Sequence, residues 1–320
     1  MPVNSNKPER WKSDIAESVD FYNDWFMRFA PKAYRDTRIE TTKRVKFALE
    51  ATANLTHIEP AVLRQYPSVL PMLRMATAPP LARDRLIGLA GVSPNLVIGM
   101  EAYQRIPPRM SEVAVDTNLH KISQIIMKLA DGDIFSWLET GQQPTETETH
   151  RAATIVADRL CGAVADPIIR NAQERRQLAY IKEWLEQQGY SYIDVGQGLK
   201  FNEMKPGTFT FRLNVPVKQE GRTNPVNIPI DAVIMPLRSV IGDFPLLIEA
   251  KSAGDFTNTN KRRKEEATKI AQLRNNYGND VRFVLFLCGY FDSGYLGYEA
   301  AEGIDWVWEH RIDDLIEFGI

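Results

Sequence analysis

The sequence predicts a mixed α/β protein of the α+β type, with a helical N-terminal domain followed by a mixed sheet flanked by helices. Three observations predict this class. Residues 11–137 carry apolar side chains at helical spacing, interrupted by prolines. Short apolar runs typical of strands follow at 190–195, 208–217, 229–235, 244–251 and 281–288. Helical patterns at 153–188 and 261–277 precede and interrupt these runs, which is the order of a sheet with helices on both faces.

The expected domains are residues 1–150 and 151–320, because the polar segment 140–149 looks like an exposed connection. Pro31 is expected to end an aromatic-rich helix at 20–29. Asp166-Pro167 is expected to begin the helix that reaches Gln188, because proline is favoured in the first helical turn.

Residues 83–103 resemble a helix-turn-helix, with its turn at Ala90-Gly91-Val92-Ser93. The second helix of that motif is mostly apolar, so its use in helix packing or dimerisation is the alternative to DNA contact. The side chains that it offers to base edges are Asn95, Glu101, Gln104 and Arg105.

The bulk composition is that of an ordinary globular protein, with 25% charged residues and a formal net charge of -2. No apolar run approaches the roughly 18 residues of a membrane span, and the first residues lack a signal-peptide core, so a cytoplasmic protein is expected. Cys161 and Cys288 are expected to be buried free thiols. The four histidines show no paired ligand spacing, which argues against a zinc enzyme.

Two neighbouring strands, 228–235 and 244–251, carry ionisable residues where buried strands should not have them. The loop between them has the Pro, Gly and Ser content of a turn, so an antiparallel hairpin is expected. Val240 lies midway between Asp231 and Glu249, which puts the two carboxylates on paired strands, roughly 5 Å apart at the backbone. Strand alternation then places Lys251 on the face of Glu249.

Two carboxylates at this separation repel each other unless a cation lies between them. Asp and Glu oxygens with water suit Mg²⁺, and a neighbouring lysine can position the attacking water and stabilise charge on a phosphate. These groups suit metal-assisted phosphodiester hydrolysis. The alternative is a solvated surface pair of Glu249 and Lys251, against which the apolar run Leu246-Leu247-Ile248 argues, because it is typical of a covered central strand.

At these residues the sequence resembles the PD-(D/E)XK nuclease superfamily, whose motif stands here as Pro229-Ile230-Asp231 and Glu249-Ala250-Lys251, with one residue inserted before the aspartate. The expected order of helices and strands matches the fold of that superfamily. Because the helix before its first core strand often adds a metal-linked acid, Glu174 is a further candidate ligand. The alternative for Glu174 is a solvated charge group with Arg175 and Arg176.

Three segments, 155–174, 251–264 and 289–310, resemble the XamI family of type II restriction endonucleases. The resemblance implies a bacterial or archaeal enzyme that cuts both strands of duplex DNA at a short palindrome and leaves 5'-phosphate ends. It also implies a homodimer and a cognate DNA methyltransferase that protects the host. The name-giving member of the family reads GTCGAC, a specificity that these residues do not themselves display.

The resemblance also implies roles for individual residues. Asp231 and Glu249 would bind one or two Mg²⁺ ions, the Ala250 carbonyl would be a third ligand, and Lys251 would be the catalytic amine. Basic residues after the active strand would contact phosphates and asparagines would read bases, with ordinary loop structure or a solvated helix face as the alternative. These candidate DNA-binding residues are Ser252, Asn258, Asn260, Lys261, Arg262 and Arg263.

Two other functions remain open at this point. A repair or recombination nuclease with the same core would recognise DNA structure instead of sequence. A non-catalytic helix-turn-helix regulator would bind DNA through residues 83–103 and would need neither Asp231 nor Lys251.

Overall fold

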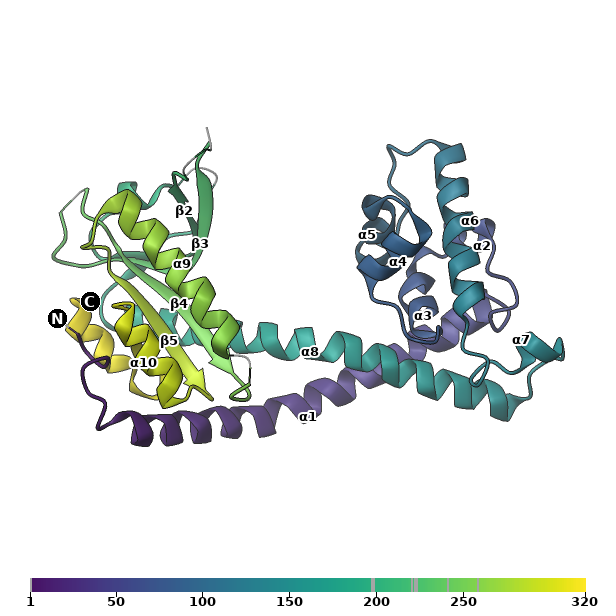
Figure 1. Ribbon diagram of the computed structural model, residues 1–320, viewed down its shortest axis with the longest axis horizontal. Helices are drawn as coiled ribbons and strands as arrows, with labels where there is room; N and C mark the ends of the chain where they lie inside the picture. Colours follow the sequence, from purple (N-terminus) through teal and green to yellow (C-terminus); the bar gives the residue numbers. More distant parts are fainter. Residues whose placement is uncertain (1, 197–198, 220, 222–223, 241, 258) are drawn as a thin grey trace. The chain divides into compact units, whose positions relative to one another are not determined.

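The computed structural model describes residues 2–196, 199–219, 221, 224–240, 242–257 and 259–320, with only the backbone described at 259–262. The chain forms two compact units (Figure 1). Unit 1 comprises Met1–Phe29 and Arg170–Ile320, and unit 2 comprises Ala30–Ile169. These cut points differ from the expected division at residue 150, because the first residues of the chain pack with its C-terminal part.

Two long helices, α1 (Trp11–Ala51) and α8 (Glu146–Gln187), each contribute residues to both units. The breaks expected at Pro31 and at Asp166-Pro167 are wrong, since both prolines lie inside these helices. A proline removes one helical hydrogen bond and usually kinks the helix. Both prolines are exposed, so water can take the freed carbonyl groups, and packing on either side holds each helix together.

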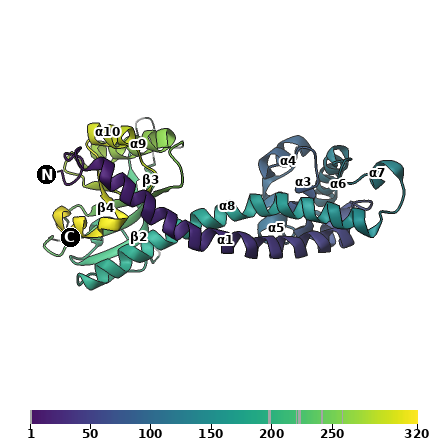
Figure 2. The same cartoon turned by 90° about the horizontal axis from the view of Figure 1, so that it is seen from below.

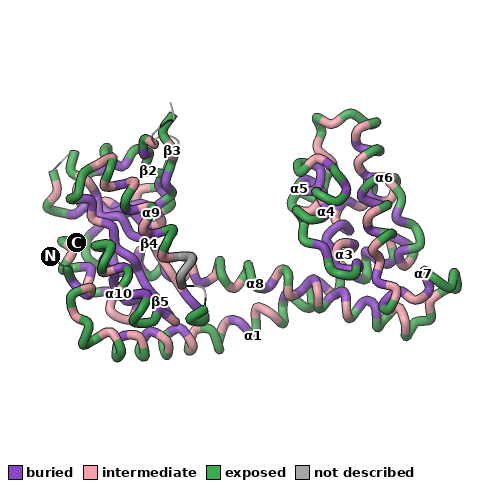
Figure 3. The backbone as a smooth tube through the Cα atoms, viewed as in Figure 1, coloured by how far each residue is buried: buried purple, intermediate pink, exposed green. Residues whose placement is uncertain are grey.

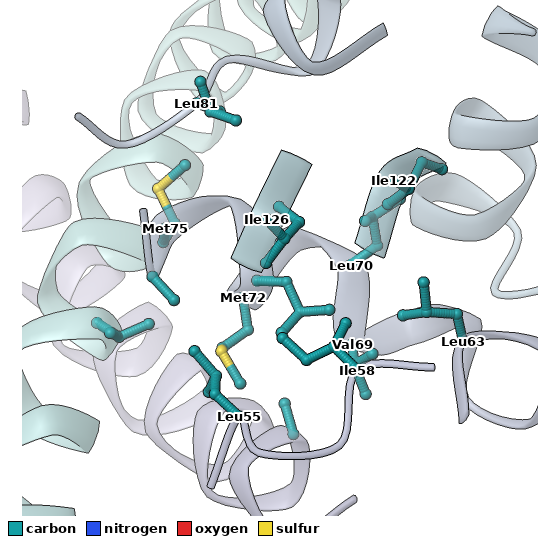
Figure 4. Close-up of a cluster of buried hydrophobic side chains, with 14 of the residues drawn as sticks. Leu55, Ile58, Leu63, Val69, Leu70, Met72, Met75, Leu81, Ile122 and Ile126 are labelled. Atoms are coloured by element: carbon teal, nitrogen blue, oxygen red, sulfur yellow. The ribbon is translucent and has the colours of Figure 1, made fainter. Parts of the chain in front are cut away.

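Unit 2 is helical. Its core gathers apolar side chains from several helices, including Leu63, Leu70, Met72, Ile122 and Ile126 (Figure 4). Beyond its parts of α1 and α8, the described elements are α2 (Pro60–Gln65), η1 (Pro67–Val69), α3 (Leu70–Met75), α4 (Arg83–Ala90), α5 (Pro94–Ala102), α6 (Glu112–Leu129) and α7 (Trp137–Thr140). Helices α4 and α5 form the expected helix pair. The chain turns between them at Gly91, whose φ of 57° is left-handed and therefore favours glycine.

Unit 1 contains a six-stranded mixed sheet in the order β1-β2-β3-β4-β5-β6. Its elements are β1 (Ser191–Tyr192), η2 (Phe201–Glu203), β2 (Thr208–Val217), β3 (Val226–Met235), β4 (Leu246–Ala253), α9 (Thr259–Tyr277), β5 (Phe283–Gly289), α10 (Ser293–Ala301), β6 (Asp305–Trp308) and η3 (Glu309–Phe318). Strand β3 pairs antiparallel with both β2 and β4, whereas β4, β5 and β6 are mutually parallel. The expected fold class is therefore confirmed.

Each face of this sheet has its own hydrophobic core, because side chains alternate along the strands. On one face, Leu247 of β4 packs with Ile270 of α9 and Leu296 of α10. On the other face, Ile248 packs with Ile181 of α8 and Ile312 of η3. Figure 2 shows the sheet between these helices, and Figure 3 shows that the central strands are buried.

Cys161 and Cys288 are buried and free, as the sequence predicts. Among the helices of the described residues, none combines the length and the apolar character that crossing a bilayer requires.

Candidate active site

The hairpin of β3 and β4 brings the two predicted carboxylates together. The strands pair over Ala232↔Ile248, Val233↔Leu247 and Ile234↔Leu246, and one further step of this register places Asp231 opposite Glu249. At that step the Asp231 carboxylate enters between the strands and its Oδ2 accepts a hydrogen bond from the Ala250 N–H at 2.9 Å. The geometry expected about Val240 is therefore present.

Lys251 joins Glu249 on the same face of β4. Its Nζ lies 2.9 Å from Glu249 Oε1, so the alternation of side chains along β4 produces the expected contact. Glu249 is only 5% exposed, because β4 is a central strand covered by helices on both faces. Such burial contradicts the alternative of a solvated surface pair.

Helix α9 supplies two further charged side chains that sequence reasoning missed. Lys269 Nζ lies 2.5 Å from Glu249 Oε1, and Glu266 Oε1 lies 3.6 Å from Lys251 Nζ. Glu266 is itself fully buried and accepts a hydrogen bond from the Tyr295 hydroxyl at 2.7 Å. Glu266 and Lys269 are three residues apart and share one face of the expected helix. That spacing was visible in the sequence, but the direction of the face was not.

Helix α8 lines the other side of a cavity of about 320 Å³ beside these groups. Gln177 Nε2 donates to the carbonyl oxygens of Lys251 and Phe286, at 3.4 and 3.3 Å, and so joins α8 to β4 and β5. The lining residues are Arg170, Gln173, Glu174, Gln177, Asp231, Glu249, Ala250, Lys251, Ser252 and Glu265. The structure therefore places Glu174 and Ser252 at the same cavity as the three motif residues.

Glu174 is paired with an arginine in an unusual backbone conformation. Arg212 Nη2 lies 2.7 Å from Glu174 Oε1. The register of β2 with β3 places Arg212 opposite Asp231, and its φ of 55° is left-handed. A left-handed non-glycine residue inside a strand is strained, and such strain clusters at functional sites. Nothing in the sequence indicated this conformation.

Burial and charge act differently on the acid and the amine. Burial, reinforced by the charge of Glu249, raises the pKa of Asp231 to about 6. Burial alone would lower the pKa of Lys251, but the nearby carboxylates of Glu249 and Glu266 outweigh it, and the pKa of Lys251 is raised. The site therefore favours a charged ammonium beside a carboxyl group that binds a proton readily.

The comparisons with known proteins decide the family. The family model described as XamI restriction endonuclease matches residues 53–308. The chain belongs to this family. The resemblance seen in the sequence is confirmed, and membership makes the protein a restriction endonuclease.

A relative from Streptomyces albus G is similar to this chain over almost the whole length of both proteins. It is the type II restriction enzyme SalI, which is 57% identical over 313 residues, covering 98% of this chain and 98% of SalI. Among solved structures, protein VC1899 of Vibrio cholerae is 12% identical, with a TM-score of 0.28, over 80% of this chain and 55% of its own.

The donor set of this XamI-family site fits a hard divalent cation. Asp231 and Glu249 offer carboxylate oxygens, and Glu249 Oε2 is buried without a hydrogen-bond partner among the described atoms. Among the described residues, no group of three or more His, Cys, Asp or Glu side chains is arranged around a possible ion. Two carboxylates suit Mg²⁺, which keeps several water ligands and takes others from its substrate.

Of the predicted DNA-binding residues, Ser252 lines the cavity and Arg263 lies on α9. The Arg263 guanidinium carbon is 3.6 Å from the centre of the Tyr298 ring, a cation–π contact. Asn258 lies outside the described residues, as do the side chains of Asn260, Lys261 and Arg262.

Unit 2 of this XamI-family protein has a separate cavity of about 600 Å³ at the second helix of the helix-turn-helix. Its lining residues are Ser93, Asn95, Ile98, Gly99, Tyr103, Arg105, Pro107, Pro108, Arg109 and Met110. Glu101 is not available there for base contact, because its side chain is 3% exposed and pairs with Arg74 at 2.6 Å and Arg83 at 2.8 Å. The expectation that Glu101 faces base edges is wrong, since these pairs join α5 to α3 and α4.

Proposed function

We propose that this protein is a type II restriction endonuclease that hydrolyses phosphodiesters on both strands of duplex DNA, with Mg²⁺ as its cofactor. The observation that carries the proposal is the meeting of Asp231, Glu249 and Lys251 at one partly buried point, in a chain that belongs to a restriction endonuclease family. These groups are the parts that metal-assisted phosphodiester hydrolysis requires.

Asp231 and Glu249 would hold one or two Mg²⁺ ions. The Ala250 carbonyl is a third candidate ligand, because a strand residue directs its N–H and C=O toward the same neighbour and the Ala250 N–H already meets Asp231. Glu174 is a fourth candidate, since it lines the same cavity. When bound, Mg²⁺ supplies positive charge that stabilises the negative charge developing on the phosphate.

Lys251 would act through its charge. Its raised pKa favours the ammonium form, which Glu249 and Glu266 hold in place. An ammonium group can donate hydrogen bonds to a phosphate oxygen and orient the attacking water, but it cannot remove a proton from that water. Gln177 fixes the carbonyl of Lys251 from the α8 side, which limits movement of the active strand.

DNA contacts would come from two places. In unit 1, Ser252 lies near the end of β4, and the candidates that follow this strand in the sequence are Asn258, Asn260, Lys261, Arg262 and Arg263. In unit 2, the cavity beside α5 presents Asn95, Arg105 and Arg109, and arginine and asparagine are frequent readers of guanine and adenine edges. Tyr103, which is 65% exposed there, adds an aromatic face.

A palindromic target is best served by a twofold homodimer, because each subunit can then cut one strand. GTCGAC, the site of the family's name-giving member, is the proposed target, with 5'-phosphate ends as products. A DNA methyltransferase of the same specificity would protect the host, and the enzyme would act in the bacterial or archaeal cytoplasm, where the DNA is.

A limit digest of plasmid DNA in Mg²⁺ tests this function. The proposal expects discrete fragments, and sequencing of their ends should give one short palindrome with 5'-phosphates. A smear, or cuts confined to branched DNA, would instead indicate the structure-specific nuclease. Binding without any cleavage would indicate the regulator, and either result would contradict the proposal.

A further inference from the structure

One carboxylate oxygen in the candidate active site is in contact with two ammonium groups. Glu249 Oε1 lies 2.9 Å from Lys251 Nζ and 2.5 Å from Lys269 Nζ. Lys251 belongs to the strand motif, whereas Lys269 comes from α9, eighteen positions later in the chain. The second oxygen, Glu249 Oε2, is buried without a hydrogen-bond partner among the described atoms. The two cations therefore concentrate on one oxygen while the other is left for a different partner.

The two lysines are held unequally. Lys251 has a second carboxylate, Glu266, at 3.6 Å, and Glu266 is fixed in turn by the Tyr295 hydroxyl. Both lysines feel the charge of Asp231. Among the described residues, Lys269 otherwise meets only the Pro229 carbonyl at 3.5 Å, which is a long hydrogen bond. Lys269 is therefore the more easily displaced of the two.

The charges in contact here predict which group must move when a metal ion arrives. Asp231, Glu249 and Glu266 offer three carboxylates to two ammonium groups. Like charges in contact at a partly buried site repel each other strongly, and a dication doubles the repulsion that a single positive charge would exert at the same distance. A divalent ion bound to Glu249 would thus expel the weaker-held ammonium. The phosphodiester of DNA brings the negative charge that an expelled ammonium needs.

We propose that Lys269 is a second phosphate-binding cation of the active site, which neutralises Glu249 in the metal-free enzyme and moves to the scissile phosphate when a divalent ion and DNA bind. This inference rests on the proposed nuclease function. The side chain of Lys269 is 24% exposed, and it extends from α9 to the same carboxylate that Lys251 contacts. Lys269 would then have two roles. It would compete with the metal ion for Glu249 before DNA binds, and it would contact the scissile phosphate afterwards.

The test compares Lys269→Met, Lys269→Arg and wild-type protein in two measurements. The first is Ca²⁺ binding by calorimetry without DNA, with Ca²⁺ as a hard divalent probe. Loss of the competing ammonium should make Lys269→Met bind Ca²⁺ about 3- to 10-fold more tightly, whereas Lys269→Arg should stay near wild type. The second is single-turnover cleavage of duplex DNA in Mg²⁺, where Lys269→Met should lose about 100-fold and Lys269→Arg should recover part of that loss.

Lys200→Met is the matched control, because Lys200 is an exposed lysine paired with Glu203 at 3.3 Å outside the site. It should match wild type in both measurements. Unchanged or weaker Ca²⁺ binding by Lys269→Met overturns the proposal, as does a cleavage rate within about threefold of wild type. If wild-type protein fails to cut any duplex, the proposed function fails instead, and the Ca²⁺ comparison still decides whether Lys269 competes with a cation. If Lys269→Met does not fold, Lys269→Gln, which also removes the positive charge, takes its place in both measurements, with the same expected results.

Discussion

At the scale of single residues, the candidate active site was predictable because ionisable residues stand in strands that are otherwise expected to be buried. Asp231 and Glu249 are carboxylates in strands whose side chains are mostly apolar, and their closeness was predictable from the position of Val240. Lys269, Glu266 and Arg212 were not predictable. The contacts of the first two depend on which face of α9 meets the sheet, and that of Arg212 depends on a left-handed backbone inside a strand. Local pattern fixes neither property.

Protonation of Asp231 should set the pH dependence of metal binding. Its pKa of about 6 means that a proton occupies the carboxylate below that pH, and a divalent ion needs the ionised form. Ca²⁺ affinity measured by calorimetry should therefore fall about tenfold for each pH unit below about 6. Asp231→Asn should bind Ca²⁺ weakly at every pH and lose this dependence. Constant wild-type affinity from about pH 7.5 to about pH 5 would contradict this assignment.

At the scale of elements, hydrophobic pattern located the central strands and α9 closely, and it failed at the two internal prolines. The short apolar runs became β2 to β5 because their side chains fill both cores of the sheet. Pro31 and Pro167 do not end their helices, because each lies on an exposed side where water can satisfy the freed carbonyl. The low helix propensity of proline predicts a break, but it does not take into account the packing of the helical segments before and after each proline.

The contact between α9 and α10 should make stability depend on pH through Glu299. Burial and the neighbouring Glu266 raise the pKa of Glu299 to about 9, well above its unfolded value. The folded state then holds a proton that the unfolded state releases, so the free energy of unfolding should decrease as pH rises toward 9, by up to about 1.4 kcal/mol per pH unit.

Glu299→Gln keeps a neutral group of the same shape and should remove most of this decrease in urea titrations. The control Glu302→Gln alters an exposed side chain and should keep the wild-type slope. Equal slopes for wild type and Glu299→Gln would show that Glu299 is ionised in the folded protein.

The ion pairs of Glu101 should stabilise unit 2. Because Glu101 joins α5 to α3 and α4, its replacement leaves the largely buried Arg74 without its carboxylate partner. Glu101→Ala should lower the free energy of unfolding by about 3 kcal/mol. The control Asp116→Ala removes an exposed pair with Arg64 and should cost under about 1 kcal/mol. Similar losses in both variants would refute a structural role for Glu101.

At the scale of the whole molecule, the proposed nuclease site lies in unit 1, and a separate cavity lined by two arginines lies in unit 2. The sequence predicted the fold class and the family. It did not predict that residues 1–29 belong with the sheet, because that association depends on contacts between distant segments. Packing of Trp11 against Trp306, with ring centres 5.6 Å apart, is one such contact.

The assembly should be a twofold dimer on DNA. Sedimentation of the protein with a duplex that contains one GTCGAC site, in Ca²⁺, should give two chains per duplex, since a palindrome presents two equivalent half-sites. A duplex with a single changed base pair should bind about 10-fold or more less tightly. One chain per duplex would contradict the dimer.

The most direct test measures DNA binding and DNA cleavage separately in variants of Asp231 and Lys251. Single-turnover cleavage in Mg²⁺ should be undetectable for Asp231→Ala and for Lys251→Ala, while both variants still bind the cognate duplex with affinities within about tenfold of wild type. Cutting at the wild-type rate by either variant would show that the reaction takes place elsewhere in the molecule.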